Sequence, residues 1–242
     1  MTICVVGAGV IGMLSSLQLA EQGASVVLLD QHSAGTEASW AGGGIVSPLY
    51  PWRYDASISA LAHWSQDFYP KLGEALQQQS GIDPEVHVTG LYWLDLEDED
   101  QALAWAHRHT RPLHRVAMEQ VRAAVPSLGE GFSKAVYMPG VANVRNPRLL
   151  QSLRAALAKL PNVTIIEHCP VSGFVREGTR IVGVQTAQGE MRADQVVVAA
   201  GAWSGNLLAT LGLELPVLPV LPPRNCSEPL LLAGSSVGSI GR

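Results

Sequence analysis

The chain has 242 residues, which is long enough to bury a substantial core in one large domain or two small ones. Hydrophobic residues make up 47% of it and charged residues only 15%, a composition that excludes an intrinsically disordered protein. The formal net charge of -5 at pH 7 argues against a nucleic-acid-binding protein, since such proteins gather positive charge around phosphates.

The start of the chain follows the order strand, glycine turn, helix, strand. Residues 2–6 are a continuous apolar run, as expected for a strand of a parallel sheet that is buried on both faces. Leu14, Leu17 and Leu19 then fall at helical spacing, and residues 25–29 form a second apolar strand. The pattern predicts a βαβ unit at the start of an α/β domain.

The turn of this unit carries a GxGxxG motif formed by Gly7, Gly9 and Gly12. In dinucleotide-binding proteins the three glycines allow a tight turn, close approach of the backbone to a pyrophosphate, and close packing of helix on strand. The amides of Val10 and Ile11 are expected at the positive end of the helix dipole, where phosphate binds favourably. The motif therefore predicts a dinucleotide site.

Asp30 stands at the end of the second strand, where a carboxylate can accept hydrogen bonds from the ribose of an adenosine. A 2′-phosphate would face that carboxylate, so the residue disfavours NADP. The fingerprint alone does not separate FAD from NAD. An ordinary turn followed by a surface aspartate is the alternative without a ligand.

The middle of the chain predicts an antiparallel insertion. Residues 33–51 are rich in glycine, serine and alanine and predict a loop, and residues 58–80 have the periodicity of an amphipathic helix. Residues 86–95 alternate as a strand does, residues 97–109 form an acidic helical segment, and residues 134–138 again have the pattern of a strand. These elements suggest an antiparallel sheet inserted between two halves of the first domain.

The rest of the chain returns to the pattern of the first domain. It predicts a helix over residues 149–160, a strand over 163–167, a hairpin from 172–176 and 181–186, and a last buried strand over 195–200. Small residues end that last strand and would let a dinucleotide lie across it, which favours FAD over NAD. If the segment is an ordinary core strand, an NAD-binding module stays open as an alternative.

Five segments carry distinctive motifs: VVGAGVIG at residues 5–12, SWAGGGIVSPLYPWRY at 39–54, VTGLYWL at 88–94, GVANVRNPRLL at 140–150 and VVVAAGAWS at 196–204. Together with Asp30 they resemble the D-amino-acid-oxidase-like flavoproteins and, within them, the glycine oxidases of bacterial thiazole biosynthesis. The first and last motifs occur across the superfamily, whereas those at 39–54 and 140–150 are more specific. The resemblance runs from residue 1 to about residue 220.

The resemblance implies FAD as cofactor and oxidative deamination of glycine or other small amino acids and amines. A hydride would pass to the flavin, the imine would hydrolyse to the oxo-acid and ammonia, and oxygen, as electron acceptor, would give hydrogen peroxide. D-Amino-acid dehydrogenases share the fold but pass electrons to a membrane carrier, and they are the runner-up class. A homo-oligomer is compatible with both classes.

The implied fold class is α/β, with a Rossmann-like FAD-binding domain and an inserted, incomplete antiparallel β-sheet substrate domain. Residues 1–85 and 143–217 are assigned to the FAD-binding domain and residues 86–142 to the partial substrate domain. Residues 218–242 are assigned to a divergent, irregular tail.

The resemblance also implies further cofactor-binding residues beside the GxGxxG motif and Asp30. Each of those in the loops could instead be a simple turn former. Gln31 would lie near the adenosine and the backbone of Val171 at the adenine, while Glu37, Ala38 and Ser39 would line the cofactor, Gly42, Gly43 and Gly44 would run beside the isoalloxazine, and Gly201 would mark the late small-residue segment.

No metal site, membrane span or export signal is predicted. The three cysteines are widely spaced, and no carboxylate completes a metal set with His107, His109 and His114, which are better explained as solvated helix-face residues. No stretch reaches the roughly 18 apolar residues of a membrane span, and no basic region precedes the first strand. We therefore expect a cytoplasmic protein.

Aromatic and basic residues supply weaker candidates for the substrate site. Trp40, Trp52 and Trp64 could wall an active site, although packing in the core explains them equally well. Arg53 and Arg145 could bind a carboxylate, on the ground of charge alone.

The end of the chain departs from the family pattern. Family members continue past this length, and the arginine that clamps the substrate carboxylate belongs to their later region, so the catalytic residues are unknown. Closely spaced prolines after residue 215 predict an irregular tail, and a frameshift in the last third would explain it. Two interpretations compete, namely a working oxidase and a truncated, inactive FAD-binding remnant.

Overall fold

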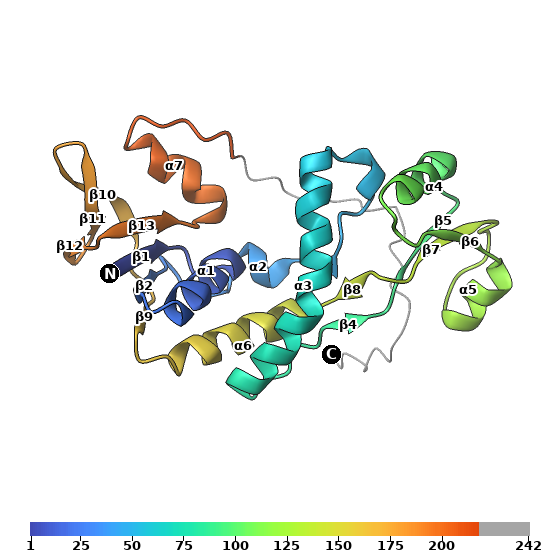
Figure 1. The fold of residues 1–242 in the computed structure, drawn as a ribbon, viewed down its shortest axis with the longest axis horizontal. Coiled ribbons are helices and arrows are strands. Elements are labelled where there is room, and N and C mark those ends of the chain that lie inside the picture. Colours follow the sequence, from blue (N-terminus) through green and yellow to red (C-terminus); the bar gives the residue numbers. More distant parts are fainter. Residues whose placement is uncertain (218–242) are drawn as a thin grey trace. The chain divides into compact units, whose positions relative to one another are not determined.

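The structure, a computed structural model, describes residues 1–217, which form two compact units (Figure 1). The first unit contains residues 1–43 and 74–84 and the described residues from 145 onward. Of the described residues, the second unit contains 44–73 and 85–144. The irregular tail predicted for residues 218–242 lies outside the described residues.

The limits of the two units differ from the predicted domain limits over residues 44–73. This stretch clusters with the second unit, because Trp52 packs into the core of that unit. The assignment of a cofactor domain and a substrate domain stays a prediction.

The first unit is built on a parallel sheet of four strands in the order β13-β1-β2-β9. β1 (Thr2–Val6) lies between β2 (Ser25–Leu29) and β13 (Gln195–Val198), and β9 (Val163–Ile166) pairs with β2. All four strands were predicted from their apolar runs, with small differences at the carboxyl ends of β9 and β13. The first βαβ unit and two strands from much later in the chain thus end at one edge of the sheet.

Both faces of this sheet are covered, which explains the uninterrupted apolar run of β1. Successive strand residues point to opposite faces. On one face, Cys4 and Val6 pack with Val184 and Leu207 in one cluster. On the other face, Ile3 and Val5 are also buried. Parallel strands buried in this way lose the alternation of half-exposed strands.

Helices α1 (Val10–Glu21) and α6 (Asn146–Ala158) pack against each other, and they contact β2 and β9, respectively. The other covering layer contains an antiparallel sheet of β10 (Val171–Glu177), β11 (Arg180–Thr186) and β12 (Gly189–Arg192), together with α7 (Ser204–Ala209). The predicted hairpin is therefore confirmed, and β12 is an additional strand that its short polar sequence did not reveal.

The second unit contains two antiparallel sheets of three strands each. The first has the order β3-β8-β4 and consists of very short strands: β3 (Ile45–Val46), β8 (Ala142–Asn143) and β4 (His87–Val88). The second has the order β5-β7-β6: β5 (Leu91–Leu94), β7 (Ala135–Met138) and β6 (His114–Val116). The predicted antiparallel character of the insertion is confirmed.

The prediction of one strand over residues 86–95 was wrong. Thr89 and Gly90 interrupt it, and the two pieces pair in different sheets. Gly90 has a positive φ of 76°, a backbone conformation that ends a regular strand. The alternating sequence pattern continued across this break and therefore did not reveal it.

The second unit also contains all or part of three helices and one turn of 3-10 helix. They are η1 (Pro51–Arg53), the first part of α3 (Ala56–Ser80), α4 (Glu99–Arg108) and α5 (Met118–Ala124). The core of this unit contains the edge-to-face pair Trp52 and Trp93, whose ring centroids are 5.4 Å apart, together with Trp105. Trp52 is thus a core residue, one of the two roles weighed for it.

Only part of the apolar stripe predicted along α3 is buried. Leu72 and Leu76 are buried, whereas the side chains of Leu61 and Trp64 are 72% and 64% exposed. Trp64 stacks on Phe68 with 4.8 Å between ring centroids. Helical periodicity identified the helix correctly but did not distinguish its covered half from its exposed half.

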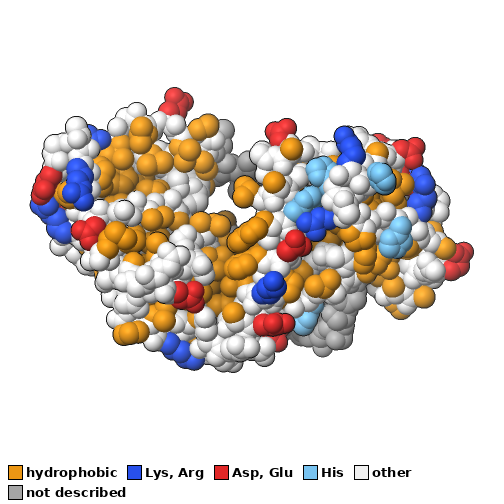
Figure 2. Space-filling view, in the orientation of Figure 1, with side chains coloured by type: hydrophobic (Ala, Val, Ile, Leu, Met, Phe, Trp, Pro, Cys, Tyr) orange, Lys and Arg blue, Asp and Glu red, His pale blue; other side chains and the backbone are white. Residues whose placement is uncertain are grey.

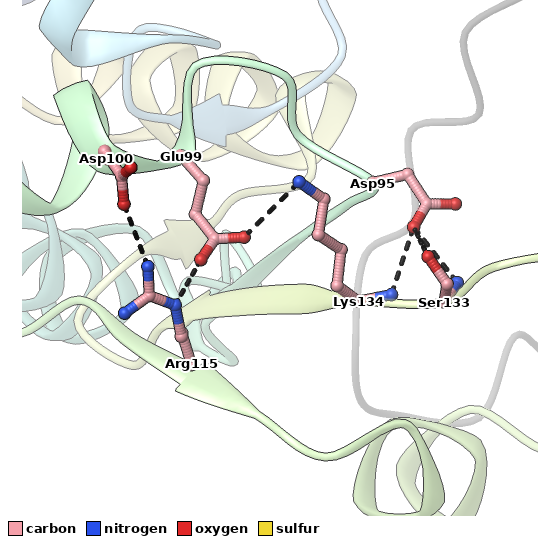
Figure 3. Close-up of polar contacts among 6 residues, drawn as sticks. All are labelled: Asp95, Glu99, Asp100, Arg115, Ser133 and Lys134. Atoms are coloured by element: carbon pink, nitrogen blue, oxygen red, sulfur yellow. Dashed lines mark hydrogen bonds and ion pairs between the residues drawn. The ribbon is translucent and has the colours of Figure 1, made fainter.

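A polar network joins β5, α4, β6 and β7 in the second unit (Figure 3). Arg115 binds the mostly buried Glu99 and, at 2.9 Å, Asp100, while Lys134 lies 3.8 Å from Glu99. Asp95 accepts the N–H groups of Ser133 and Lys134, each at 3.0 Å. These donors lower the pKa of Asp95, led by Ser133, and the network fixes the turn between β5 and α4.

The histidines that were weighed as metal ligands lie in the second unit. Figure 2 shows several histidine side chains on the second unit, and His107, His109 and His114 are all exposed. His114 lies in β6, not on a helix face as predicted. Among the described residues, no helix is long and apolar enough to cross a membrane, and no three His, Cys, Asp or Glu residues group as metal ligands.

Candidate functional site

The glycine turn between β1 and α1 lies at the carboxyl edge of the parallel sheet. Gly7 has a φ of +103°, and its N–H donates to the carbonyl of Leu29 in β2 at 2.7 Å. A Cβ at Gly7 would lie 2.4 Å from the carbonyl oxygen of Ala199, which follows β13. The late small-residue segment and the GxGxxG turn are therefore in direct contact, and only glycine allows that approach.

Gly12 lets the first turn of α1 close on the strand. A Cβ at this position would lie 1.8 Å from the carbonyl oxygen of Gly7 and 3.5 Å from the Cβ of Ala199. The packing role predicted for the third glycine therefore matches the geometry. A larger residue would have to push α1 away from the turn.

The first turn of α1 presents its amides outward. Gly9 is the N-cap residue and provides no side-chain cap, and the turn contains no acidic side chain. The amides at the start of a helix have no acceptor within the helix, and they carry its partial positive charge. Ile11, in this turn, is 64% exposed.

Ser39 supplies a hydroxyl group to the same helix end. Its Oγ accepts the N–H of Val10 at 3.0 Å, and it lies 3.0 Å from the position that a Cβ of Gly9 would take. Ser39 belongs to the short helix α2 (Ala38–Ala41), whose N-cap residue is Glu37. Since its oxygen accepts from Val10, its hydroxyl proton can be donated elsewhere.

Asp30, directly after β2, connects the glycine turn to the loop that follows. Its Oδ2 accepts the N–H of Ala8 at 2.7 Å and its Oδ1 accepts the N–H of His32 at 2.8 Å. A carboxylate offers about four lone pairs, so each oxygen can accept one further hydrogen bond. The neighbouring Gln31 is exposed.

Glu37 and Ala38 begin α2 and differ in what they contact. The carbonyl of Glu37 accepts the N–H of Trp40 at 2.9 Å, and its carboxylate pairs with the side chain of His32 at 2.8 Å. Ala38 is exposed. The carboxylate of Glu37 is thus engaged within the loop, and its backbone organises the helix that carries Ser39.

The three consecutive glycines after α2 have different surroundings. A Cβ at Gly42 would lie 2.5 Å from Nδ2 of Asn146, whereas one at Gly43 would meet nothing within 4 Å. Gly44 has a φ of +73° and belongs to the second unit, where its carbonyl accepts the N–H of Val144 at 2.8 Å. Packing therefore accounts for Gly42, but nothing in the described protein requires glycine at position 43.

Val171 and Gly201 complete the predicted set in the first unit. Val171 opens β10, pairs with Thr186 and is half-buried. Gly201 has a φ of +53° and opens the 3-10 turn η2 (Gly201–Trp203) after β13. No contact joins either of them to the glycine turn among the hydrogen bonds of residues 1–217.

Arg53, weighed as a carboxylate-binding residue, pairs with a carboxylate of the protein itself. It forms a two-pronged ion pair with Asp98 in the second unit, with Nε–Oδ2 2.8 Å and Nη2–Oδ1 3.0 Å. Its guanidinium carbon also lies 4.0 Å from the ring centroid of Tyr50. Arg145 is the N-cap residue of α6 in the first unit.

The residues at the sheet edge fit a dinucleotide. Position 12 admits no Cβ, the first turn of α1 contains no acidic side chain, and the carboxylate of Asp30 has spare acceptor capacity beside it. A pyrophosphate suits such a helix end, and a ribose hydroxyl suits such a carboxylate. The donors and acceptors of this edge therefore match those that an adenine dinucleotide needs.

Two contacts at this edge were missed by the sequence analysis. Ala199 approaches Gly7 and Gly12, and Glu167 at the end of β9 accepts the N–H of Ala34 at 2.7 Å. The alanine lay within a recognised segment, but its partner could not be read from spacing. The Glu167 contact joins residues 133 positions apart, and no local pattern signals such a pair.

The chain matches known proteins over most of its length. The model of a family described as FAD dependent oxidoreductase (DAO) matches residues 2–225. The chain is 63% identical to a glycine oxidase of Pseudomonas putida and 61% identical to one of Pseudomonas aeruginosa, in each case over 90% of this chain. It spans 60% of the length of these curated relatives.

The fold also matches a solved structure. The crystal structure of glycine oxidase from Geobacillus kaustophilus superposes with a TM-score of 0.79 at 27% sequence identity. The match covers 88% of this chain and 58% of that one.

Proposed function

We propose, from the premise that this chain belongs to the family of FAD-dependent oxidoreductases, that it holds FAD at the carboxyl edge of its parallel sheet. Membership of this family confirms the resemblance that the sequence motifs indicated. It also confirms the predicted α/β fold class. The observation that carries the proposal is the turn in which Gly7, Gly12 and Ala199 touch beneath the open end of α1.

The residues of this edge divide the proposed binding between them. The amide of Ile11 and the hydroxyl of Ser39 bind the pyrophosphate, Val10 holds that hydroxyl through its own N–H, and the missing side chain of Gly9 leaves room beside Ser39. Asp30 accepts the adenosine ribose, with Gln31 beside it. Val171 meets the adenine, whereas Glu37, Ala38 and the glycines 42–44 line the cofactor and Gly201 lies where the dinucleotide crosses the sheet edge.

For the whole protein we propose oxidation of glycine or another small amino acid or amine, which the family and the glycine oxidase relatives support. FAD, when bound, supplies the acceptor for the hydride that leaves the substrate. The products would be the oxo-acid, ammonia and, with oxygen as acceptor, hydrogen peroxide. A role in thiazole formation for thiamine, a cytoplasmic location and a homo-oligomer stay predictions.

The test is the absorption spectrum of the purified chain, incubated with FAD and freed of excess cofactor, before and after anaerobic addition of glycine. Retained flavin bands that bleach with glycine, followed by peroxide when oxygen returns, support both parts of the proposal. Bleaching without peroxide would favour the dehydrogenase class instead.

Two other outcomes separate binding from catalysis. Flavin bands that persist after glycine would support the FAD site and contradict turnover by this chain, as expected for an inactive remnant. A chain that retains no flavin but binds NADH would contradict the FAD site and favour an NAD-binding module.

A further inference from the structure

We propose that Glu167 is a positioning residue for the adenosine end of the FAD site, a role that rests on the proposed function. Glu167 directly follows β9, and its Oε1 accepts the N–H of Ala34 at 2.7 Å. Ala34 lies in the loop between β2 and α2 and is 8% exposed. The bond therefore joins the end of one strand to the middle of the loop that leaves its neighbour.

The amide of Ala34 needs this acceptor. A buried backbone N–H that loses its hydrogen bond is strongly disfavoured, so the loop would move to find water or another acceptor. The Glu167 side chain is only 23% exposed, and its second oxygen, Oε2, binds Nη2 of Arg154 at 2.8 Å. Arg154, on α6, thus holds the carboxylate in the orientation that meets Ala34.

The loop is anchored separately at its start. The N–H of Cys169 donates to the carbonyl of Asp30 at 2.8 Å, and the N–H of His168 donates to the carbonyl of His32 at 3.3 Å. These backbone bonds do not depend on the side chain of Glu167. Loss of that side chain would therefore leave Asp30 in place and release the loop around Ala34, while Glu37 keeps its ion pair with His32.

The released part leads to the second proposed ligand group. Glu37 begins α2 shortly after Ala34, and α2 carries Ser39, whose hydroxyl meets the N–H of Val10. Together with the Glu37–His32 pair and the Ser39–Val10 bond, the Glu167 bond thus helps to set the distance between the carboxylate of Asp30 and the hydroxyl of Ser39, which we assign to ribose and pyrophosphate. Glu167 itself contacts neither group, so its effect on binding is indirect.

The test compares variants of the full chain for binding of FAD and, as a probe of the adenosine end alone, ADP. Glu167→Ala removes the acceptor and should weaken both ligands about tenfold or more. Glu167→Gln keeps an oxygen that can accept from Ala34 and should restore binding to within about threefold of the unchanged chain. Glu177→Gln, which alters an exposed carboxylate paired with Arg192, is the matched control and should change neither affinity.

Hydrogen exchange at the amide of Ala34, measured in the cofactor-free chain, gives an independent measurement. We expect faster exchange in Glu167→Ala and unchanged exchange in Glu167→Gln and Glu177→Gln. Unchanged exchange or unchanged ADP affinity in Glu167→Ala would overturn the inference, as would a glutamine variant as defective as the alanine one. Exchange could respond as expected while neither the variants nor the unchanged chain bind FAD. In that case the proposed function fails, but Glu167 still holds the loop.

Discussion

The carbonyl oxygen of Gly7 lies where the side chain of any residue other than glycine at position 12 would begin. The separation from an added Cβ is 1.8 Å, far inside van der Waals contact. The backbone of the turn therefore fills the space that a side chain at position 12 would need. The third glycine of the motif is required by packing even before any ligand binds.

Replacement of Gly12 by alanine should separate the helix end from the turn. We expect Gly12→Ala to lower the free energy of unfolding by about 1–3 kcal/mol and to weaken FAD binding about a hundredfold. Urea unfolding and flavin fluorescence titration measure the two effects. Gly173→Ala is the control, because its added Cβ would meet only Oγ1 of Thr210 at 4.0 Å, and equal losses in both variants would contradict the argument.

Gly43 offers the opposite case, a glycine that the described protein does not need. A Cβ at Gly43 would meet nothing within 4 Å. We therefore expect Gly43→Ala to change the unfolding free energy by less than about 0.5 kcal/mol while weakening FAD binding about tenfold, because a nearby cofactor would occupy that space.

Gly42→Ala makes the comparison sharper. Its added Cβ would lie 2.5 Å from Nδ2 of Asn146, the end of a side chain, so Asn146 must turn away and this variant should lose slightly more stability than Gly43→Ala. Unchanged FAD affinity in Gly43→Ala would remove Gly43 from the proposed cofactor site. Stability is measured by urea unfolding and affinity by flavin fluorescence.

The parallel sheet and its glycine turn could be predicted because their causes are local in sequence. β1 is buried on both faces and so reads as an unbroken apolar run, and the spacing of Gly7, Gly9 and Gly12 follows from one turn and one helix start. The strand ends of β9 and β13 were set by tertiary contacts and were less well predicted.

What could not be predicted depends on partners distant in sequence. The break at Thr89 and Gly90 divides two sheets that no periodic pattern distinguishes. Glu167 and Arg154 look like ordinary charged surface residues in the sequence. Only the fold brings Glu167 to Ala34 and Arg154 to Glu167. Arg53 was a candidate carboxylate ligand by charge, yet Asp98 satisfies it within its own unit.

Asp98 should stabilise the second unit in a pH-dependent way. Its hydrogen bond from Arg53, followed by that from the indole N–H of Trp52 at 2.8 Å, lowers its pKa to about 2. A carboxylate with a lowered pKa stabilises the fold above its ordinary pKa, and this stabilisation is lost as the pH falls towards the lower value. Asp98→Ala also leaves the indole N–H of the buried Trp52 without this acceptor.

We expect Asp98→Ala to lower the unfolding free energy by about 1–2 kcal/mol at pH 6, a figure reduced because Arg53 is half-exposed. The difference from the unchanged chain should shrink between pH 4 and about pH 2, as followed by urea unfolding. Asp100→Ala is the control, since the Asp100 side chain is 96% exposed, and it should have little effect. A difference that is the same at pH 6 and pH 2 would contradict the ion-pair explanation.

Cys4 should make the first unit sensitive to alkaline pH. Burial, with a smaller contribution from Cys169, raises the pKa of the Cys4 thiol from 9.0 to about 11. Below pH 9 the folded and unfolded chains both keep the proton, so the thiol contributes no pH dependence. Between pH 9 and about 11 only the unfolded chain releases it, so stability should fall by up to about 1.4 kcal/mol per pH unit.

The Cys4→Ala variant isolates this effect from other groups that titrate in the same range. Its unfolding free energy, measured in urea from pH 8 to 10.5, should fall less steeply than that of the unchanged chain, although the smaller side chain lowers its stability at every pH. Parallel curves would show that Cys4 ionises equally in both states.

The burial of Cys4 also predicts how the thiol reacts with Ellman's reagent. In a Cys226→Ser chain, the reagent should react with Cys4 only after unfolding. The thiolate is the form that attacks the reagent, and in the folded sheet it is scarce and shielded.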